Sequence, residues 1–146
     1  PGQFCFLTLH RESGPAQQHP FTISTSPTSD GRIGFTIKES GDFTNTIGET
    51  RPGDMATIEG PFGLFSHLAR CRDGRPLVMI AGGVGITPML SMLRFMAANS
   101  DPRRIVLIWG NKTEADIIAR NEFERLAEPG GAGVGHGLAG WAAVEQ

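Results

Sequence analysis

Residues 77–90 read LVMIAGGVGITPML and combine a strand, a glycine turn and a helix start. The first part is a continuous apolar run, which is typical of a parallel strand buried on both faces. After the glycines, Thr87 is a suitable N-cap and Pro88 suits the first helical position. The following apolar residues have helical spacing and predict one buried stripe, namely Met89, Leu90, Leu93, Met96 and Ala97. We therefore predict a buried strand followed by a helix over residues 87–99.

A second strand and helix follow the first pair. Residues 104–110 (RIVLIWG) form another apolar, β-prone run, and residues 113–127 have the composition of a helix. Thr113 and Asp116 resemble a capping box at the start of that helix. Strands that alternate with helices are typical of a parallel α/β nucleotide-binding domain.

The first half of the chain has a different pattern. Short apolar or alternating runs occupy residues 4–9, 21–26, 32–38 and 54–60, and glycine- or proline-containing turns separate them. Strands of this length and spacing predict a small antiparallel barrel or sandwich. The fold class predicted for the whole chain is therefore a β barrel followed by an α/β unit.

Composition excludes several functions. The 146 residues are 39% hydrophobic and 19% charged, with a net charge of −2, so the chain can bury a core but has no basic surplus for nucleic acid. The longest apolar run, residues 77–81, is too short to cross a bilayer. Two isolated cysteines give no metal-binding spacing and fit a cytoplasmic setting. Residues 129–146 are rich in glycine and alanine and read as linker or disorder.

The glycine turn at residues 81–90 is the strongest chemical signal. Glycines let a ligand approach the backbone, and the start of the following helix offers free N–H groups to a phosphate. The turn lacks the lysine of a Walker loop and is not a full GxGxxG fingerprint. A tight turn with no ligand remains an equal alternative on this stretch alone.

Four segments in order, HPFTIS, KESGDFTN, GPFG and GGVGITP, resemble the ferredoxin–NADP reductase superfamily over about residues 1–127. The resemblance implies a partial antiparallel FAD-binding barrel over residues 1–73 and a truncated parallel NAD(P)-binding domain over residues 74–128. Residues 129–146 would then be a tail. The His-Pro-Phe-Thr version of the flavin signature looks most like the ferric reductase and NADPH oxidase branch.

The resemblance also implies roles for individual residues. Phe21 would lie against the flavin ring and Thr22 beside its reactive N5 edge, while Thr87 would stand between the flavin and nicotinamide rings. Thr22 and Thr87 are thus the predicted catalytic residues. The residues implied for FAD are His19, Pro20, Phe21, Thr22, Ile37, Lys38, Gly41, Asp42, Phe43 and Thr44. Those implied for NADP or NAD are Gly82, Gly83, Gly85, Ile86, Thr87, Pro88 and Lys112. No metal ligand is predicted.

Taken singly, these residues have ordinary structural explanations. The explanations are a core position for Phe21, exposed strand positions for Thr22, Ser24 and Ser26, a helix cap for Thr44 and solvated charges for Lys38 and Lys112. His19 also departs from the superfamily signature, which has arginine there. Since histidine is only partly charged near neutral pH, phosphate binding would depend more on backbone amides and Lys38.

The activity implied is that of an NAD(P)H-dependent flavin oxidoreductase. A hydride would pass from NADPH or NADH to FAD, and electrons would then pass to haem, an iron–sulfur centre or ferric iron on further sequence or on another protein. Lys112 leans toward NADPH. The alternatives are a non-catalytic flavin- or nucleotide-binding module and an interaction domain that has lost its cofactor.

Relative to the superfamily, the chain begins late and ends early, which suggests a gene fragment or, in the tail, a shifted reading frame. The predicted location is the cytoplasm, alone or as the cytoplasmic part of a membrane-associated reductase. We predict no nucleic-acid partner and no membrane span.

Overall fold

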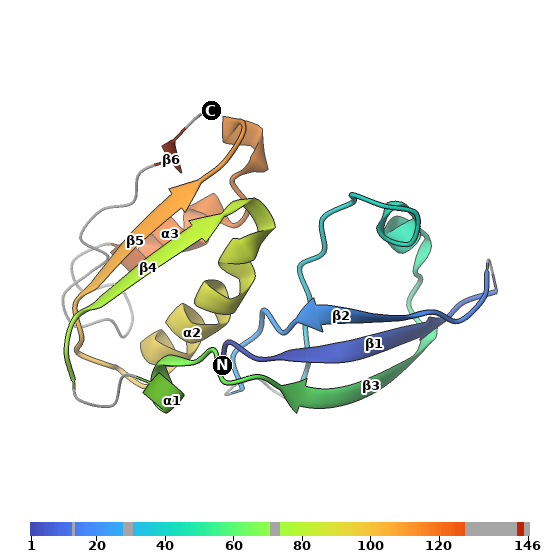
Figure 1. Ribbon diagram of the computed structural model, residues 1–146, viewed down its shortest axis with the longest axis horizontal. Coiled ribbons are helices and arrows are strands. Elements are labelled where there is room, and N and C mark those ends of the chain that lie inside the picture. Colours follow the sequence, from blue (N-terminus) through green and yellow to red (C-terminus); the bar gives the residue numbers. More distant parts are fainter. Residues whose placement is uncertain (13, 28–30, 71–73, 128–142, 145–146) are drawn as a thin grey trace.

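The computed structural model describes residues 1–12, 14–27, 31–70, 74–127 and 143–144. Two sheets lie side by side, an antiparallel sheet from the first half of the chain and a parallel sheet from the second (Figure 1). The predicted order of an antiparallel β unit followed by a parallel α/β unit is confirmed. No helix among the described residues is long and apolar enough to cross a bilayer.

In the antiparallel sheet, β1 (Phe4–His10) lies between β2 (Gln18–Thr22) and β3 (Met55–Phe62). Alternate residues of β1 are buried, as the period of a strand requires. A 3₁₀ helix, η1 (Thr44–Glu49), lies on the segment that connects β2 to β3. The whole of β3 is exposed, although its sequence alternates.

Two of the predicted strands in this half differ from the structure. The strand expected over residues 21–26 begins earlier and ends at Thr22, and residues 32–38 make only one bridge, between Phe35 and Ile23. The chain leaves the sheet after Thr22 because the next carbonyls bond to a helix of the second half. The carbonyl of Ser24 accepts from Arg94, and that of Thr25 accepts from Ser91.

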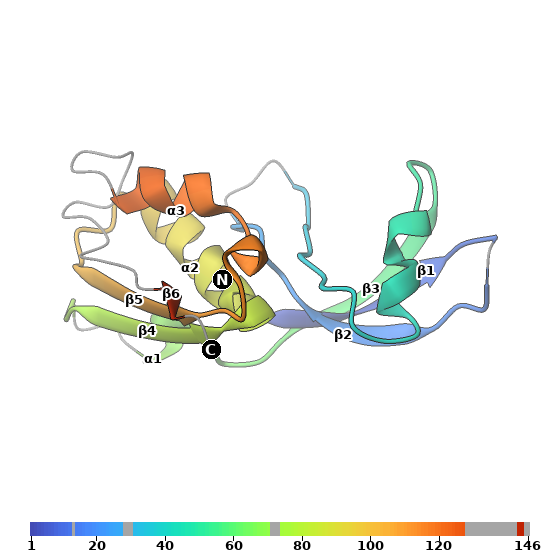
Figure 2. The ribbon, with the colours of Figure 1, turned by 90° about the horizontal axis from the view of Figure 1, so that it is seen from above.

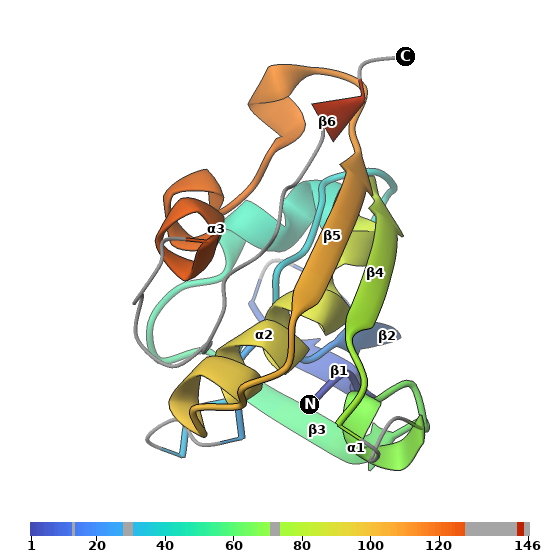
Figure 3. The same cartoon turned by 90° about the vertical axis from the view of Figure 1, so that its left-hand side faces the viewer.

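The parallel sheet contains β4 (Leu77–Gly82), β5 (Ile105–Gly110) and the two-residue β6 (Ala143–Val144). Helices α2 (Thr87–Ala98) and α3 (Arg120–Ala127) cover the same face of this sheet (Figure 2 and Figure 3). The buried core between them has these members: Leu77, Met79, Ile86, Met89, Leu90, Met92, Leu93, Met96, Ile105, Leu107, Trp109 and Phe123. The predicted apolar stripe of α2 is confirmed, with Ala97 packed at its margin.

No element among the described residues covers the other face of the parallel sheet. Val78, Ile80 and Ile108 are 65%, 67% and 41% exposed. The prediction that β4 and β5 are buried on both faces is therefore wrong here, because both described helices pack against a single face. The prediction of a tail without regular structure is also wrong at Ala143–Val144, which pair with β5. The remainder of the tail lies outside the described residues.

The predicted helix boundaries are partly wrong. A 3₁₀ turn, η2 (Gly83–Ile86), leads directly into α2, so Thr87 is already helical rather than the N-cap, and its hydroxyl donates to the carbonyl of Val84 at 3.1 Å. The helix expected over residues 113–127 is interrupted by Ala119, whose φ is 51°. It is divided into η3 (Glu114–Asp116) and α3, and the capping box of Thr113 and Asp116 is confirmed.

Helix α2 is buried on a second side, where it meets the antiparallel half. Ser91 and Met92 are both almost fully buried. The hydroxyl of Ser91 donates to Thr25 and accepts from the amide of Gly2, and the sulfur of Met92 accepts from the amide of His67 in the short helix α1 (His67–Arg70). The helix therefore joins the two sheets.

The contrast between the two faces of β5 can be measured. Leu107 is 1% exposed and its neighbour Ile108 is 41% exposed. We expect Leu107→Ala to lower the free energy of unfolding by about 2–5 kcal/mol because it opens a cavity, and Ile108→Ala to lower it by about 1 kcal/mol or less. Urea unfolding of both variants tests this; equal losses would mean that the face of Ile108 is covered in solution.

The burial of His67 predicts a pH dependence. Its ring is 4% exposed, and neither ring nitrogen has a hydrogen-bond partner among the described residues. Burial, reinforced by the charge of Arg103 and opposed by Asp101, lowers the pKa of His67 from its ordinary value of 6.5. As pH falls below about 6.5 the unfolded chain therefore takes up this proton first, and stability is lost. Urea titrations at about pH 7 and pH 5 should show a smaller loss for His67→Leu than for the wild type; equal losses would contradict this.

Candidate functional site

The carboxyl ends of β4 and β5 meet at one edge of the parallel sheet. Gly82 is paired with Gly110, the last residue of β5, so the glycine turn and the segment that begins at Asn111 emerge together. In open parallel sheets this edge is where ligands bind. The strand directions alone thus bring two sequence-distant segments to one site.

The backbone of the glycine turn is open. A Cβ placed on Gly82, Gly83 or Gly85 would meet no atom within 4 Å, and Gly83 has a φ of 48°. The indole of Trp109 donates to the carbonyl of Gly83 at 2.9 Å and holds the turn from below. The open main chain followed at once by a twelve-residue helix suits a phosphate-containing ligand.

Two adjoining hollows lie at this edge. One, of about 400 Å³, is lined by Gly82, Gly83, Asn111, Lys112 and other residues, and the second, of about 170 Å³, includes Ile37. Lys38, Gly83 and Asp116 line both. The structure therefore brings together two predicted flavin residues, Ile37 and Lys38, and three predicted nucleotide residues, Gly82, Gly83 and Lys112.

Asn111 is an unexpected member of the larger hollow. It is 6% exposed, yet neither its amide nitrogen nor its amide oxygen has a partner among the described residues. A buried amide without partners is destabilising by about 1–3 kcal/mol, and such groups are rare in folded chains. Because Asn111 lines the larger hollow, its unpartnered N–H groups and carbonyl oxygen are candidates for hydrogen bonds to a ligand there.

Lys38 already forms an ion pair in this structure. Its ammonium lies 3.0 Å from a carboxylate oxygen of Asp116, and this ion pair joins the antiparallel half to η3. The pKa of Asp116 is lowered, first by the hydroxyl of Thr113 and then by Lys38. A phosphate that binds Lys38 must share it with Asp116 or displace that carboxylate.

The rings predicted for the flavin lie close together at the end of β2. His19 stacks on Phe43 with centroids 4.0 Å apart, and Phe21 lies 6.2 Å from Phe43 and 6.5 Å from Phe35. Phe21 is half-buried rather than a core residue. The result is an aromatic surface built from β2 and the segment before η1.

The Gly-Asp-Phe-Thr segment forms a compact turn. The hydroxyl of Thr44 accepts from the amides of Ser40 and Gly41, each at 3.0 Å, so it does not cap a helix that begins at Asn45. Two amides directed at one oxygen are the arrangement that binds a phosphate oxygen in anion sites. Both amides are occupied by Thr44 in this structure, so a phosphate of FAD would bind them by taking the place of its hydroxyl.

The remaining predicted residues are placed as follows. The side chain of Thr22 is half-buried and makes no hydrogen bond within the described part of the chain, whereas Thr87 is buried and bonded to Val84. Ile86 is buried in the core, and Pro88 is half-buried at the start of α2. The expectation that Ser24 and Ser26 are solvated is wrong, since they are 3% and 7% exposed beside α2.

Comparison with known proteins gives two family matches in the predicted order. An FAD-binding domain model matches residues 1–66, and an oxidoreductase NAD-binding domain model matches residues 79–134. The chain belongs to the ferredoxin–NADP reductase superfamily.

Individual relatives agree with this assignment. NADH-cytochrome b5 reductase 2 of Mycosarcoma maydis is 37% identical over 123 residues, which are 82% of this chain and 35% of that protein. Among solved structures, the cytochrome b5 reductase domain of Ulva prolifera nitrate reductase has a TM-score of 0.75 at 25% identity, over 99% of this chain and 60% of that one. Flavohemoglobin from Malassezia yamatoensis, solved with bound FAD and heme, has a TM-score of 0.69 at 25% identity, over 99% of this chain and 36% of that one. The chain spans less than half the length of the curated relatives it matches.

Sequence reasoning missed three residues that shape the site. Asn111 directly follows β5 and Trp109 is the last residue but one of that strand. Residues at the carboxyl end of a parallel strand could have been recognised as site candidates from the strand pattern alone. Asp116 was assigned only to the capping box, because its partner Lys38 is 78 residues away in the sequence.

The amide of Asn111, which has no partner among the described residues, should lower the stability of the ligand-free chain. Replacing it with leucine, whose side chain has the same branching and number of heavy atoms but no polar atoms, should raise the free energy of unfolding of the ligand-free chain by about 1–3 kcal/mol. Asn45→Leu, at an exposed position in η1, is the control and should change it by less than about 0.5 kcal/mol. Urea unfolding measures both; a loss of stability in Asn111→Leu would show that the amide is satisfied in solution.

Proposed function

We propose that the chain is the flavin reductase part of an NAD(P)H-dependent oxidoreductase. The observation that carries this is the open glycine backbone at the carboxyl edge of β4, which shares a hollow with Lys38 from the antiparallel half. One half thus presents groups suited to a flavin and the other a turn suited to a dinucleotide, on either side of one opening. The matched FAD-binding and NAD-binding models support the same division.

Each half has a defined part in this proposal. The aromatic surface of Phe21 and Phe43 would support the flavin ring, and the amides of residues 40 and 41 with Thr44 would hold its phosphates. Thr22, whose hydroxyl makes no bond within the described residues, would donate to the flavin ring. When bound, FAD supplies the ring that accepts a hydride from the nicotinamide and releases electrons to a further centre.

The nucleotide would be held by the chain's main-chain groups. The open backbone of Gly82 and Gly83 allows close approach, and the 3₁₀ turn η2, which continues directly into α2, would present its first N–H groups and the positive dipole end to a phosphate. Asn111 would take one hydrogen bond in each direction from the ligand. Asp116 would release Lys38 to a phosphate as the dinucleotide enters the hollow.

The electron acceptor is proposed to be haem, an iron–sulfur centre or ferric iron on another protein or domain. Names of similar proteins support this class, since they include a cytochrome b5 reductase and a flavohemoprotein. A cytoplasmic location stays a prediction of the sequence. The boundaries at residues 73 and 128 are likewise proposed, and they lie outside or at the limit of the described ranges.

The choice between NADH and NADPH depends on Lys112. This exposed residue lines the larger hollow, and its positive charge would suit an additional phosphate on the adenosine ribose. We therefore propose NADPH as a substrate, with NADH as the alternative that the names of several relatives favour.

A visible spectrum tests the proposal directly. The chain purified with FAD should be yellow, and anaerobic addition of NADPH or NADH should bleach the flavin absorbance within seconds. A chain that binds FAD but is not bleached by either nucleotide would be the non-catalytic module instead. A chain that binds no flavin would contradict the proposed function altogether.

Gly82→Val separates nucleotide binding from folding. Gly82 has an extended backbone with φ −126° and ψ 130° and open space around it, so valine is tolerated by the strand but intrudes where the dinucleotide must pass. We expect the same melting temperature and flavin content as the wild type, with flavin reduction at least ten-fold slower, about 1.4 kcal/mol in the barrier.

The matched control is Gly14→Val, which also has open space but lies in the β1–β2 loop. It should reduce its flavin at the wild-type rate. Gly82→Val could instead bind less FAD while the FAD that stays bound is reduced at the wild-type rate. That result would mean that the glycine turn contacts FAD rather than the dinucleotide.

A further inference from the structure

Helix α2 holds the strand that leaves the flavin signature by two neighbouring carbonyls. Arg94 donates to the carbonyl of Ser24 at 2.6 Å, and Ser91 donates to the carbonyl of Thr25 at 2.8 Å. Residues three apart lie on the same side of a helix, so one face of α2 makes both contacts. Ser24 in turn stands two residues after Thr22 in the chain.

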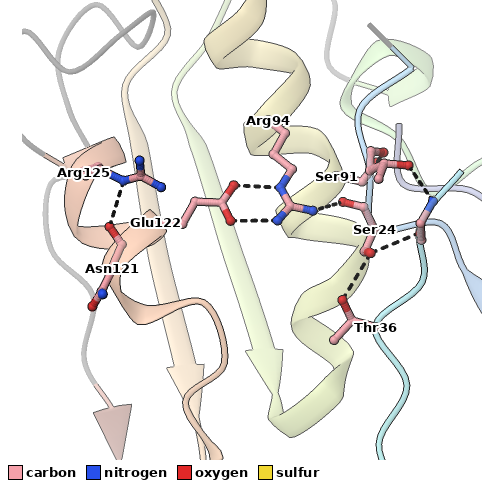
Figure 4. A network of polar contacts seen from close by, with 9 residues as sticks. Ser24, Thr36, Ser91, Arg94, Asn121, Glu122 and Arg125 are labelled. Atoms are coloured by element: carbon pink, nitrogen blue, oxygen red, sulfur yellow. Dashed lines mark hydrogen bonds and ion pairs between the residues drawn. The ribbon is translucent and has the colours of Figure 1, made fainter. Parts of the chain in front are cut away.

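Arg94 is itself fixed from its other side. Its Nε donates to one carboxylate oxygen of Glu122 in α3 and one Nη donates to the other, both at 2.7 Å. The second Nη donates to the carbonyl of Ser24 (Figure 4). Both side chains are partly buried, at 30% and 24% exposure. A planar guanidinium can make this two-sided arrangement, whereas a lysine ammonium cannot reproduce its fork.

The Ser24 side chain adds to the same network. Its hydroxyl donates to the carbonyl of Gly34 and accepts from the hydroxyl of Thr36 (Figure 4). Thr36 lines the smaller hollow next to Lys38. The network therefore extends from α3, through α2, to both segments of the antiparallel half that approach the candidate site.

The contacts of Arg94 and Ser91 with the antiparallel half differ from the ion pair of Lys38 and Asp116, which also joins the two halves. Lys38 is 49% exposed in its pair with Asp116, and exposed ion pairs contribute little to stability because water and salt screen them. The bonds of Arg94 and Ser91 are less accessible to water and end on main-chain atoms, so they constrain the backbone itself. They also begin on the helix that starts at the glycine turn.

We propose that Arg94, oriented by Glu122, is a positioning residue for hydride transfer. It sets the separation between the strand that carries Phe21 and Thr22 and the turn that carries Gly82 and Gly83, and it acts through the carbonyl of Ser24. This inference rests on the proposed function. Hydride transfer requires the two reacting rings in close contact, and a displacement of about 1 Å can slow such a reaction a hundred-fold.

The test compares Arg94→Lys and Glu122→Gln in the FAD-loaded full chain. We expect flavin reduction at saturating nucleotide to slow at least ten-fold in Arg94→Lys and about three-fold in Glu122→Gln, with the dissociation constants of FAD and nucleotide within two-fold of the wild type. Arg125→Lys is the control, because Arg125 is an exposed arginine of α3 that bonds only weakly, at 3.3 Å, to Asn121 of its own helix (Figure 4).

Amide hydrogen exchange gives a second readout without catalysis. The amides of Ile23 and Ser24, which bond to Gln3 and Gly34, should exchange faster in Arg94→Lys, while the amides at the centre of β1 keep wild-type protection. A purely stabilising role for Arg94 would instead lower protection throughout the chain. Ser91→Ala, which removes the other carbonyl contact, should give the same local effect at smaller size.

The outcomes separate the two claims. If the wild type is reduced and Arg94→Lys is reduced equally fast with unchanged exchange, the positioning role is wrong and the proposed function stands. If Arg94→Lys loses FAD or melts at a much lower temperature, Arg94 is a stabilising residue and the positioning role is also wrong. If neither nucleotide reduces the wild type, both claims fail.

Discussion

The two-sided burial of helix α2 is the constraint on which the rest of the structure depends. One side of the helix packs its apolar stripe against β4 and β5, and the other side places Ser91 and Met92 against the antiparallel half. Because the same helix begins at the glycine turn, its position fixes three things at once: the core of the parallel unit, the junction of the two halves and the direction of the turn. None of these could shift without the other two.

The polar contacts between α2 and the antiparallel half depend on this apolar packing of the helix. Hydrogen bonds to Ser24 and Thr25 contribute modestly to stability by themselves, since folding exchanges them for bonds to water. Their larger effect is on geometry, because they direct the chain away from the sheet after Thr22. The segment that follows then returns past Thr36 and Lys38 to the edge of the glycine turn.

Much of this fold could be predicted from the sequence because its strongest signals are local. The strand before the glycines and the helical stripe after them require only neighbouring residues, and both elements were predicted correctly, although the burial of both strand faces was not. The burial of Ser24 and Ser26 could not be predicted, because it is caused by α2, which is distant in the sequence. The strand expected over residues 32–38 is reduced to one bridge, and α2 binds the carbonyls of Ser24 and Thr25 next to that bridge.

The candidate site divides in the same way. The open turn at Gly82 and Gly83 could be predicted because glycines at a strand end leave the backbone accessible, whereas the capping assignment of Thr87 failed because the glycines continue as a 3₁₀ turn into the helix. Asn111 escaped notice because an asparagine after a strand is an ordinary turn residue until its burial is known. The roles of Phe21, Thr22 and Thr44 came from the superfamily resemblance, and the structure adds which groups surround them.

The indole of Trp109 gives the molecule an intrinsic optical probe. Its N–H bonds to Gly83 within the glycine turn, and its ring centroid lies 5.4 Å from that of Phe123 in α3. The chain has no tyrosine and one other tryptophan, Trp141, which lies outside the described residues. Fluorescence excited at the indole band therefore originates partly from the base of the turn, and a yellow chromophore bound nearby would quench it by energy transfer.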